Sequence, residues 1–271
     1  MKRYKTMLTI AGSDSGGGAG IQADIKTASA NGVFGMSVIT SVTAQNTKGV
    51  SGVHVLPAEF VRQQAEMVLD DIGVDAVKLG MLPTPEIVDV VVELIRKYRI
   101  GNVVLDPVMI ATSGDRLISE EAIGRIITEL LPLVRVITPN IPEAEFITGL
   151  KLSEANPADY RRIAQDFFDK KAKAVLIKSG HLDAVEVEDC LFDGSVDTLY
   201  KYPYRKVETP NTHGTGCTLS SAIASYLALG FDLPEAVGQA EDYIHAAVAA
   251  GADYQLGGGH GPVHHFFKCW K

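Results

Sequence analysis

Short apolar segments alternate with longer amphipathic segments through the middle of the chain, and this alternation restricts the fold more than any other feature. The strand-like segments are 75–79, 102–105, 133–137 and 173–178, and the helix-like segments are 57–71, 84–98, 119–131, 142–148 and 156–170. This spacing is typical of a largely parallel sheet with helices on both faces. We therefore expect an α/β fold and, because no linker or repeat interrupts the 271 residues, one domain over 1–271.

The two ends of the chain extend the pattern. The additional strands expected are 6–11, 37–44, 50–56 and two within 185–201, and the additional helices are 21–30, 215–229 and 233–250. The strands within 185–201 are expected to form an antiparallel edge.

Charge and cysteine content exclude several classes of function. The formal net charge is −8 and the pI is about 5.4, which argues against a nucleic-acid-binding surface. The three cysteines show no C-x-x-C spacing, which argues against a disulfide framework and for a reducing compartment. No apolar run has the length of a signal peptide core or a membrane span. We expect a cytoplasmic protein that binds a small molecule, not nucleic acid or a membrane.

Residues 209–217 form a glycine-broken turn directly before an apolar helix. Gly214 and Gly216 permit a tight backbone without Cβ clashes. The free N–H groups of the first helical turn, with the positive end of the helix dipole behind them, favour an anion in front of the helix. Cys217 lies where a base would contact the group that attacks this anion.

A second glycine-rich loop, 12–20, follows the first expected strand. It fits neither common nucleotide fingerprint: a P-loop would end in Gly-Lys-Ser/Thr, and G-x-G-x-x-G does not match the three adjacent glycines. Asp24, one turn into the next helix, either faces back across the loop or is a solvated acid that suits the helix dipole. Gln45 either caps a turn or offers paired amide groups to a heteroaromatic ring.

Polar residues follow several of the expected strands, where an open α/β sheet binds its ligands. Asp106, Asn140 and Lys178 each come directly after a strand, and Glu143 lies close to Asn140. Each alone could be a turn residue. Together they supply an acid suited to Mg²⁺, an amide, a phosphate-seeking lysine and an anion site, a set that indicates phosphoryl transfer.

Seven segments, in order along the chain, resemble the hydroxymethylpyrimidine/phosphomethylpyrimidine kinases of thiamine biosynthesis, in the vitamin-kinase branch of the ribokinase superfamily. They are AGSDSGGGAGIQADIKT (11–27), VTAQNTKGV (42–50), VKLGML (77–82), VVLDPVM (103–109), ITPNIPEAE (137–145), THGTGC (212–217) and GPVHHF (261–266). The resemblance implies a three-layer α/β/α ribokinase-like fold with a mostly parallel sheet, usually as a homodimer. It also implies phosphorylation, with ATP and Mg²⁺, of the hydroxymethylpyrimidine and then of its monophosphate.

The resemblance assigns roles to individual residues. The pyrimidine would contact Gly12, Asp24, Gln45, Met81 and Val108. Mg²⁺ and its waters would be held by Asp106 and Glu143 with Asn140, while Lys178 reaches the ATP phosphates. Gly214 to Cys217 would form the anion hole, with Thr212 and Thr215 among the nucleotide contacts.

Cys217 occupies the position where many ribokinase-like sugar kinases carry an aspartate base. A thiol has an ordinary pKa of about 8.5, and a helix N-terminus lowers that value. A thiolate here could accept the hydroxymethyl proton, a gain of about 10²–10⁴-fold, although it would also repel the incoming phosphate. One departure from the family is that its usual Ala-Lys pair near the last helix reads Ala240-Glu241, which leaves the effect on nucleotide contacts open.

Four other functions remain as alternatives. A non-catalytic nucleotide-binding module is disfavoured, because it would leave without a role the polar set Asp106, Asn140, Glu143, Lys178 and Cys217. A pyridoxal kinase of the same branch shares the glycine loops and the cysteine, but such relatives tend to lack the glutamine and the GPVHHF ending. A cysteine hydrolase would use Cys217 with His213, although no third orienting group is visible. The tail residues His260, His264, His265 and Cys269 offer metal ligands, but the resemblance accounts for the adjacent histidines without a metal.

Overall fold

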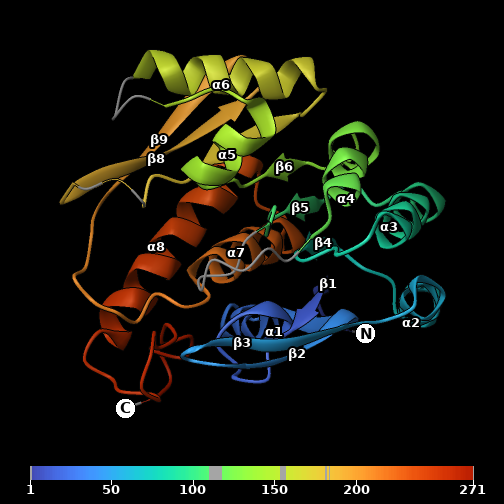
Figure 1. Ribbon diagram of the computed structural model, residues 1–271, viewed down its shortest axis with the longest axis horizontal. Coiled ribbons are helices and arrows are strands. Elements are labelled where there is room, and N and C mark those ends of the chain that lie inside the picture. Colours follow the sequence, from blue (N-terminus) through green and yellow to red (C-terminus); the bar gives the residue numbers. More distant parts are fainter. Residues whose placement is uncertain (1, 110–117, 153–156, 181, 183, 271) are drawn as a thin grey trace.

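A computed structural model describes residues 2–109, 118–152, 157–180, 182 and 184–270. The described strands form one nine-stranded sheet in the order β3-β2-β1-β4-β5-β6-β7-β8-β9 (Figure 1). These strands are β1 Thr6–Ser13, β2 Phe34–Asn46, β3 Gly49–Val55, β4 Ala76–Leu79, β5 Val103–Leu105, β6 Val136–Ile137, β7 Ala174–Ile177, β8 Glu186–Asp193 and β9 Thr198–Arg205.

Most neighbouring strands are parallel, as the alternation of segments predicts. The pairs from β2 through β1, β4, β5 and β6 to β7 are parallel, whereas β3 and the β8–β9 pair are antiparallel additions at the two edges. The central strands are buried along their whole length, which explains why they appear in the sequence as continuous apolar runs.

Helices cover both faces of this sheet. α1, α7 and α8 pack with one face in one apolar core, and α2 to α6 pack with the other face in a second core. The helices are α1 Gly20–Ala30, α2 Ala58–Asp71, α3 Pro85–Tyr98, α4 Glu120–Arg125, α5 Ile141–Thr148, α6 Pro157–Asp169, α7 Thr215–Leu229 and α8 Leu233–Gly251. The three-layer arrangement confirms the expected α/β fold, and each expected strand and helix has a counterpart.

Several bounds differ from expectation. The segment 119–131 is an α-helix followed by a π-helical turn over Ile126–Leu130, a change of hydrogen-bonding pattern that apolar periodicity does not reveal. β9 continues to Arg205, beyond the expected edge at residue 201, because its pairing with β8 extends to Glu186. Within the described residues, no helix is both long enough and apolar enough to cross a membrane.

Candidate active site

The glycine-rich loop after β1 is organised by Asp14, a residue that the sequence reasoning did not single out. Its Oδ1 accepts the N–H of Gly16 at 2.8 Å, and its Oδ2 accepts the N–H groups of Gly18 and Ala19 at 3.0 and 2.9 Å. The side chain of Gln22 closes the other side of the loop by accepting the Asp14 N–H at 2.9 Å. An acid two residues before a run of glycines is a sequence signal that could have indicated this role.

His213 joins this loop to the turn before α7. Its Nε2 lies 3.0 Å from Oδ2 of Asp14 and 3.4 Å from the amide nitrogen of Gln45. Burial would raise the pKa of Asp14, but His213 and the loop N–H groups outweigh it and hold that pKa below its usual value. Residues separated by about two hundred positions in the chain therefore meet at one point.

The contacts of Gln45 favour one orientation of its amide. Nε2 of His213 needs a proton to bond Asp14, so an amide oxygen is a better neighbour for it than an amide nitrogen. Rotating the Gln45 amide by 180° places its oxygen toward His213 and its nitrogen toward Thr43 Oγ1, at the position that is 3.1 Å from that hydroxyl. The Thr43 hydroxyl donates to the Ser13 carbonyl, so it can accept from the Gln45 nitrogen. The His213 N–H and one of the two Gln45 N–H groups then each face an acceptor, so this hydrogen-bond network favours one orientation of the Gln45 amide.

Two of the expected pyrimidine contacts, Gly12 and Met81, lie against each other at the end of β1. A Cβ on Gly12 would lie 2.9 Å from Ser41 Oγ and 3.3 Å from Met81 Sδ, so Gly12 and Met81 are in direct contact. An open cavity of about 600 Å³ is lined by Ser15, Gln45 and Asn46 among others. Val108 is partly buried beyond Asp106. A second cavity of about 550 Å³, between α6 and the β8–β9 edge, contains none of the candidate residues.

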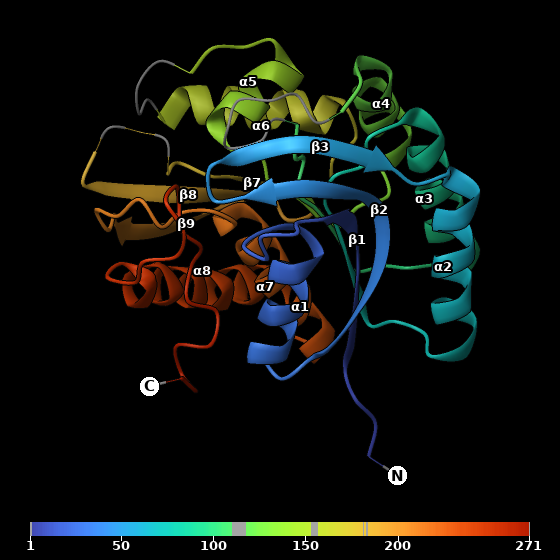
Figure 2. The ribbon, with the colours of Figure 1, turned by 60° about the horizontal axis from the view of Figure 1, so that its bottom comes forward.

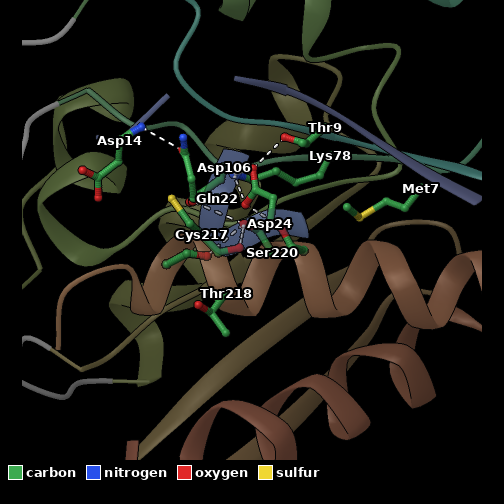
Figure 3. A network of polar contacts seen from close by, with 12 residues as sticks. Met7, Thr9, Asp14, Gln22, Asp24, Lys78, Asp106, Cys217, Thr218 and Ser220 are labelled. Atoms are coloured by element: carbon green, nitrogen blue, oxygen red, sulfur yellow. Dashed lines mark hydrogen bonds and ion pairs between the residues drawn. The ribbon is translucent and has the colours of Figure 1, made fainter. Parts of the chain in front are cut away.

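The acids and the lysine expected at the strand ends do converge. Lys178 Nζ lies 3.0 Å from Oδ1 of Asp106, and Ser220 Oγ on α7 donates to Oδ2 of the same carboxylate at 3.3 Å. Asn140 and Glu143 form a reciprocal capping box at the start of α5, with two bonds of 2.8 Å. Figure 3 shows Asp106 above the first turns of α7, close to Cys217 and Ser220.

The turn before α7 has the close backbone geometry expected of an anion site. Gly214, with φ of +81°, caps the helix, and a Cβ there would lie 1.9 Å from the carbonyl oxygen of Gly18, so only glycine fits. A Cβ on Gly216 would lie 3.4 Å from Lys178 Nζ and 3.5 Å from Oδ2 of Asp106. Thr212 and Thr215 flank the turn, and the Thr215 N–H donates to the Thr212 carbonyl. The helix N-terminus thus adjoins the lysine–carboxylate pair.

Electrostatics distinguish the two carboxylates near Lys178. Burial would raise the pKa of Asp106, but Lys178 and Lys78 lower it, so this acid stays charged. Burial lowers the pKa of Lys178, but Asp106 and Glu143 raise it by more. The net pKa of Lys178 is therefore raised, and the lysine stays charged. The pKa of Glu143 rises to about 7 through burial and the charge of Asp106. Two interacting carboxylates at a site beside an anion hole fit a hard divalent cation such as Mg²⁺, which prefers oxygen ligands and retains several waters.

Asp24 is not brought to the ligand side of the site. It is completely buried, and its oxygens accept hydrogen bonds from Thr9 at 2.6 Å, Lys78 at 2.9 Å and Ser221 at 2.6 Å (Figure 3). Lys78, which the sequence reasoning missed, is also fully buried, and Asp24 raises its pKa despite the opposing effect of burial. In this geometry Asp24 anchors Lys78 behind the glycine loop instead of contacting a ligand.

The thiol of Cys217 also differs from expectation. Burial raises its pKa to about 11, an effect larger than the lowering by Lys78, whereas the position at a helix N-terminus had suggested a lowered value. Desolvation disfavours the thiolate here, and Asp24 and Asp106 add like-charge repulsion. In this structure Cys217 is a neutral thiol at neutral pH.

The structure offers no support for the two alternatives that involve histidine. The neighbours of His213 Nε2 are Asp14 and Gln45, and a protonated Cys217 lacks the nucleophilic character that a cysteine hydrolase requires. His265 is buried and bonded to Thr218 Oγ1 at 3.1 Å. In the described part of the chain, no group of three or more histidine, cysteine or acidic side chains is arranged to hold a metal ion.

Comparisons with known proteins identify the family of the chain. A family model described as phosphomethylpyrimidine kinase matches residues 14–264. A hydroxymethylpyrimidine/phosphomethylpyrimidine kinase of Rhizobium meliloti (strain 1021) is 50% identical over 97% of this chain and 98% of its own length. A crystal structure of phosphomethylpyrimidine kinase from Clostridium difficile 630 is 48% identical, with a TM-score of 0.79 over 90% of this chain and 99% of that chain.

Pyridoxal kinases are structural neighbours at lower sequence identity. The enzyme from Staphylococcus aureus in complex with AMP-PCP is 34% identical and covers 99% of this chain and 96% of its own, with a TM-score of 0.89. The higher TM-score reports the shared backbone, which does not decide between substrates. Sequence identity and the matched family model agree with each other, and by both criteria the chain belongs to the phosphomethylpyrimidine kinase family.

Proposed function

We propose that this chain transfers the terminal phosphoryl group of ATP to the hydroxymethylpyrimidine precursor of thiamine, and then to its monophosphate. The observation that carries this proposal is 50% identity, over nearly the full length of both chains, to a kinase named for these two substrates. The complex of a structural neighbour with the ATP analogue AMP-PCP supports ATP as the donor. Pyridoxal is the second candidate acceptor, because the pyridoxal kinase of Staphylococcus aureus has almost the same backbone.

Gln45 is the residue to which we assign recognition of the pyrimidine. Its amide is fixed by the network through Thr43, His213 and Asp14 and lines an open cavity, so it meets a ring at a defined angle. Met81 and Val108 would pack on the ring, and the absence of a Cβ at Gly12 allows Met81 to approach the end of β1 closely. Asp24 contributes indirectly, by anchoring Lys78.

The phosphoryl group would lie between Lys178 and the N-terminus of α7. Lys178 is charged and held in place by Asp106, and the N–H groups of Gly216 and Cys217 have no carbonyl within the helix to bond. Thr212 and Thr215 belong to the same turn and would contact the nucleotide. Phosphoryl transfer depends mainly on alignment and on neutralising charge, and these groups supply both.

Mg²⁺ is the metal that the acids of this site would hold. Asp106 and Glu143 would bind it through water, and the capping box with Asn140 fixes the orientation of Glu143. When bound, Mg²⁺ supplies charge neutralisation to the phosphate oxygens. With the cation bound, Asp106 would interact less strongly with Lys178. The ammonium group of Lys178 would then be available to a phosphate oxygen.

We assign Cys217 to the shape of the anion hole and not to proton transfer. A thiol with a pKa of about 11 is almost entirely protonated at neutral pH. A neutral thiol also avoids the repulsion that a thiolate would exert on the incoming phosphate. Proton acceptance by Cys217 therefore has no electrostatic basis in this structure.

We also propose that the protein is a cytoplasmic homodimer with one domain in each subunit. Apolar side chains are exposed along the edge hairpin and on α2, with Val53 43% exposed, Phe60 51% and Met67 75%. β3 is an edge strand of the sheet, and an exposed apolar edge usually pairs with another chain. Sedimentation of the wild-type protein and of Val53→Lys tests this: a dimer that the lysine converts to monomer supports it, and a wild-type monomer contradicts it.

The catalytic proposal is tested by ADP release with Mg-ATP and the hydroxymethylpyrimidine as acceptor. We expect turnover by the wild type, a loss of about 10²-fold in kcat for Asp106→Asn, and normal turnover for Glu93→Gln, which removes an exposed acid on α3. We expect Gln45→Ala to raise the KM for the acceptor and to leave the KM for ATP unchanged. Turnover of pyridoxal without turnover of the pyrimidine would contradict the assignment.

A further inference from the structure

The C-terminal segment 257–262 lies between two parts of the candidate site that are far apart in the sequence. One is the turn between β2 and β3, which directly follows Gln45, and the other is the turn before α7. In both ribbon views the red C-terminal loop lies against the tip of the blue β2–β3 hairpin (Figures 1 and 2). This loop is mostly exposed, so apolar burial does not account for its position.

Hydrogen bonds fasten the segment to the hairpin at Thr47. The His260 N–H donates to the Thr47 carbonyl at 2.9 Å, and the Gly259 N–H donates to Thr47 Oγ1 at 3.2 Å. The approach is too close for side chains: a Cβ on Gly259 would lie 2.0 Å from the Thr47 carbonyl oxygen, and one on Gly257 would lie 2.4 Å from Thr47 Oγ1. The glycines of this segment therefore allow its backbone to reach the turn.

Other bonds fasten the same segment to the turn before α7. His260 Nδ1 lies 3.2 Å from the Pro210 carbonyl, and the His213 N–H donates to the Gly261 carbonyl at 3.0 Å. A Cβ on Gly261 would lie 2.1 Å from Oδ1 of Asn211, a residue that is buried and bonded to the end of α8. His213, two residues after Asn211, is the residue that contacts Asp14 and Gln45.

The chain beyond this segment is anchored on the two core helices. The His264 N–H donates to the Ala247 carbonyl on α8 at 3.0 Å, and His265 is bonded both to Thr218 on α7 and, through its carbonyl, to Tyr243. The segment is therefore a fixed support and not a free tail. Its two attachments define the distance between the hairpin and the anion-site turn.

We propose that the segment 257–262 is a positioning element for the acceptor, which sets the place of Gln45 relative to the anion site through Thr47 and His213. This inference rests on the proposed role of Gln45 in acceptor binding. A displacement of about 1 Å is enough to weaken a directional amide contact and to misalign the acceptor hydroxyl. The turn before α7, which carries the proposed nucleotide contacts Thr212 and Thr215, keeps its own bonds to the segment through Pro210 and His213. Loosening only the attachment at Thr47 therefore changes the acceptor KM and leaves the ATP KM unchanged.

Two variants test this with different perturbations of the same contact. Gly259→Ala introduces a Cβ against the Thr47 carbonyl and forces the two backbones apart. Thr47→Val keeps the shape of the side chain and removes the oxygen that accepts the Gly259 N–H, and Thr47→Ser restores that oxygen. The matched control is Gly101→Ala, where a Cβ would have no neighbour within 4 Å.

We expect the acceptor KM to rise about tenfold in Gly259→Ala and about threefold in Thr47→Val, with the ATP KM and the melting temperature close to wild type. Thr47→Ser and Gly101→Ala should retain the wild-type acceptor KM. If both perturbing variants fold and keep an acceptor KM within 1.5-fold of wild type (on the order of measurement error, about 0.2 kcal/mol), the positioning role is wrong. An equal rise in both KM values would also overturn it.

Gln45→Ala, measured in the same series, separates this inference from the proposed function. A raised acceptor KM in Gln45→Ala with no change in Gly259→Ala or Thr47→Val removes the segment's role and keeps the role of Gln45. An unchanged acceptor KM in Gln45→Ala removes the basis of both.

Discussion

Two groups of buried acids lie near the strand ends, and they differ in the cation that accompanies them. Asp24 is bonded to Lys78, and both side chains are completely buried. Asp189 on β8 and Glu241 on α8 are 3% and 4% exposed, and among the described residues neither forms an ion pair with a lysine. Asp189 accepts the Ser179 N–H at 2.7 Å, and Glu241 lies 3.1 Å from His245 Nε2.

The difference decides how each group responds to pH. In the first group, burial raises the pKa of Asp24 and Lys78 opposes that rise, while Asp24 raises the pKa of Lys78, so each charge favours the other. In the second group, burial and the mutual repulsion of the acids raise the pKa of Asp189 to about 8, and burial raises that of Glu241 to about 8. Two such carboxyl groups titrate as one unit. A lysine thus stabilises the charges of the first group, whereas the second retains a proton.

The same comparison answers the question raised by the Ala240-Glu241 pair. Glu241 is turned into the protein beside β8, where its contact with His245 Nε2 at 3.1 Å does not have the geometry of a hydrogen bond. A carboxylate placed in this way repels Asp189 and is shielded from a nucleotide at the surface. We therefore expect the departure from the family pattern to affect stability more than ATP binding.

Breaking the lysine-containing pair should have the largest effect. Lys78→Met leaves Asp24 buried without its cation, at a cost of about 3–5 kcal/mol, which lowers the melting temperature by about 10 °C. The double variant Lys78→Met/Asp24→Asn removes both charges and should recover at least half of this loss. Thermal unfolding of both variants measures it, and a change below about 2 °C in the single variant would contradict a tight buried pair.

For the second group, Asp189 and Glu241, we expect the stability of the fold to decrease as the pH rises. The folded-state pKa values of Asp189 and Glu241, about 8, lie above the unfolded values of about 4, so the native state binds the extra proton between these limits. The stability from this group is present at low pH and is lost as the pH rises through 8. Glu241→Gln should therefore gain about 5 °C in melting temperature relative to wild type at pH 9, and little at pH 5. An equal shift at both pH values would mean that the pKa of Glu241 is not raised in the folded state.

Cys217 shows that a nearby lysine does not always keep a buried group ionised. Lys78 lowers the pKa of this thiol, but burial raises it to about 11. Since the thiolate is scarcely populated, we expect Cys217→Ala to lose less than about tenfold in kcat, below the usual range for general-base help. The dependence of kcat on pH should have the same shape in Cys217→Ala as in the wild type. A loss of 10³-fold with intact folding, on the order of a lost base, would restore Cys217 as the base.

The smallest effect is expected for nucleotide binding in Glu241→Gln. The side chain is buried, so the KM for ATP should stay within about twofold of wild type at pH 7, which is less than 0.5 kcal/mol. Steady-state kinetics at saturating acceptor measure this. A change above about tenfold would place Glu241 in contact with the nucleotide.

The sequence predicted the sheet and the convergence of Asp106, Lys178 and Glu143, because strand ends in a parallel sheet share one edge. It did not predict Asp14, Lys78 or the acid pair at Glu241. Their roles depend on contacts between residues up to about two hundred positions apart, such as Asp14 with His213, for which local periodicity gives no signal. Burial also reversed the sign expected for the pKa of Cys217, because a local rule about helix ends omits the surrounding protein.

The most direct test of the central claim is the second phosphorylation. ADP release should be measured with Mg-ATP on the pyrimidine monophosphate, with the hydroxymethylpyrimidine and pyridoxal assayed in parallel. We predict turnover of both pyrimidines, with a lower kcat/KM for pyridoxal. Turnover of pyridoxal alone, with the monophosphate inert, would contradict the account and make this chain a vitamin kinase of the pyridoxal type.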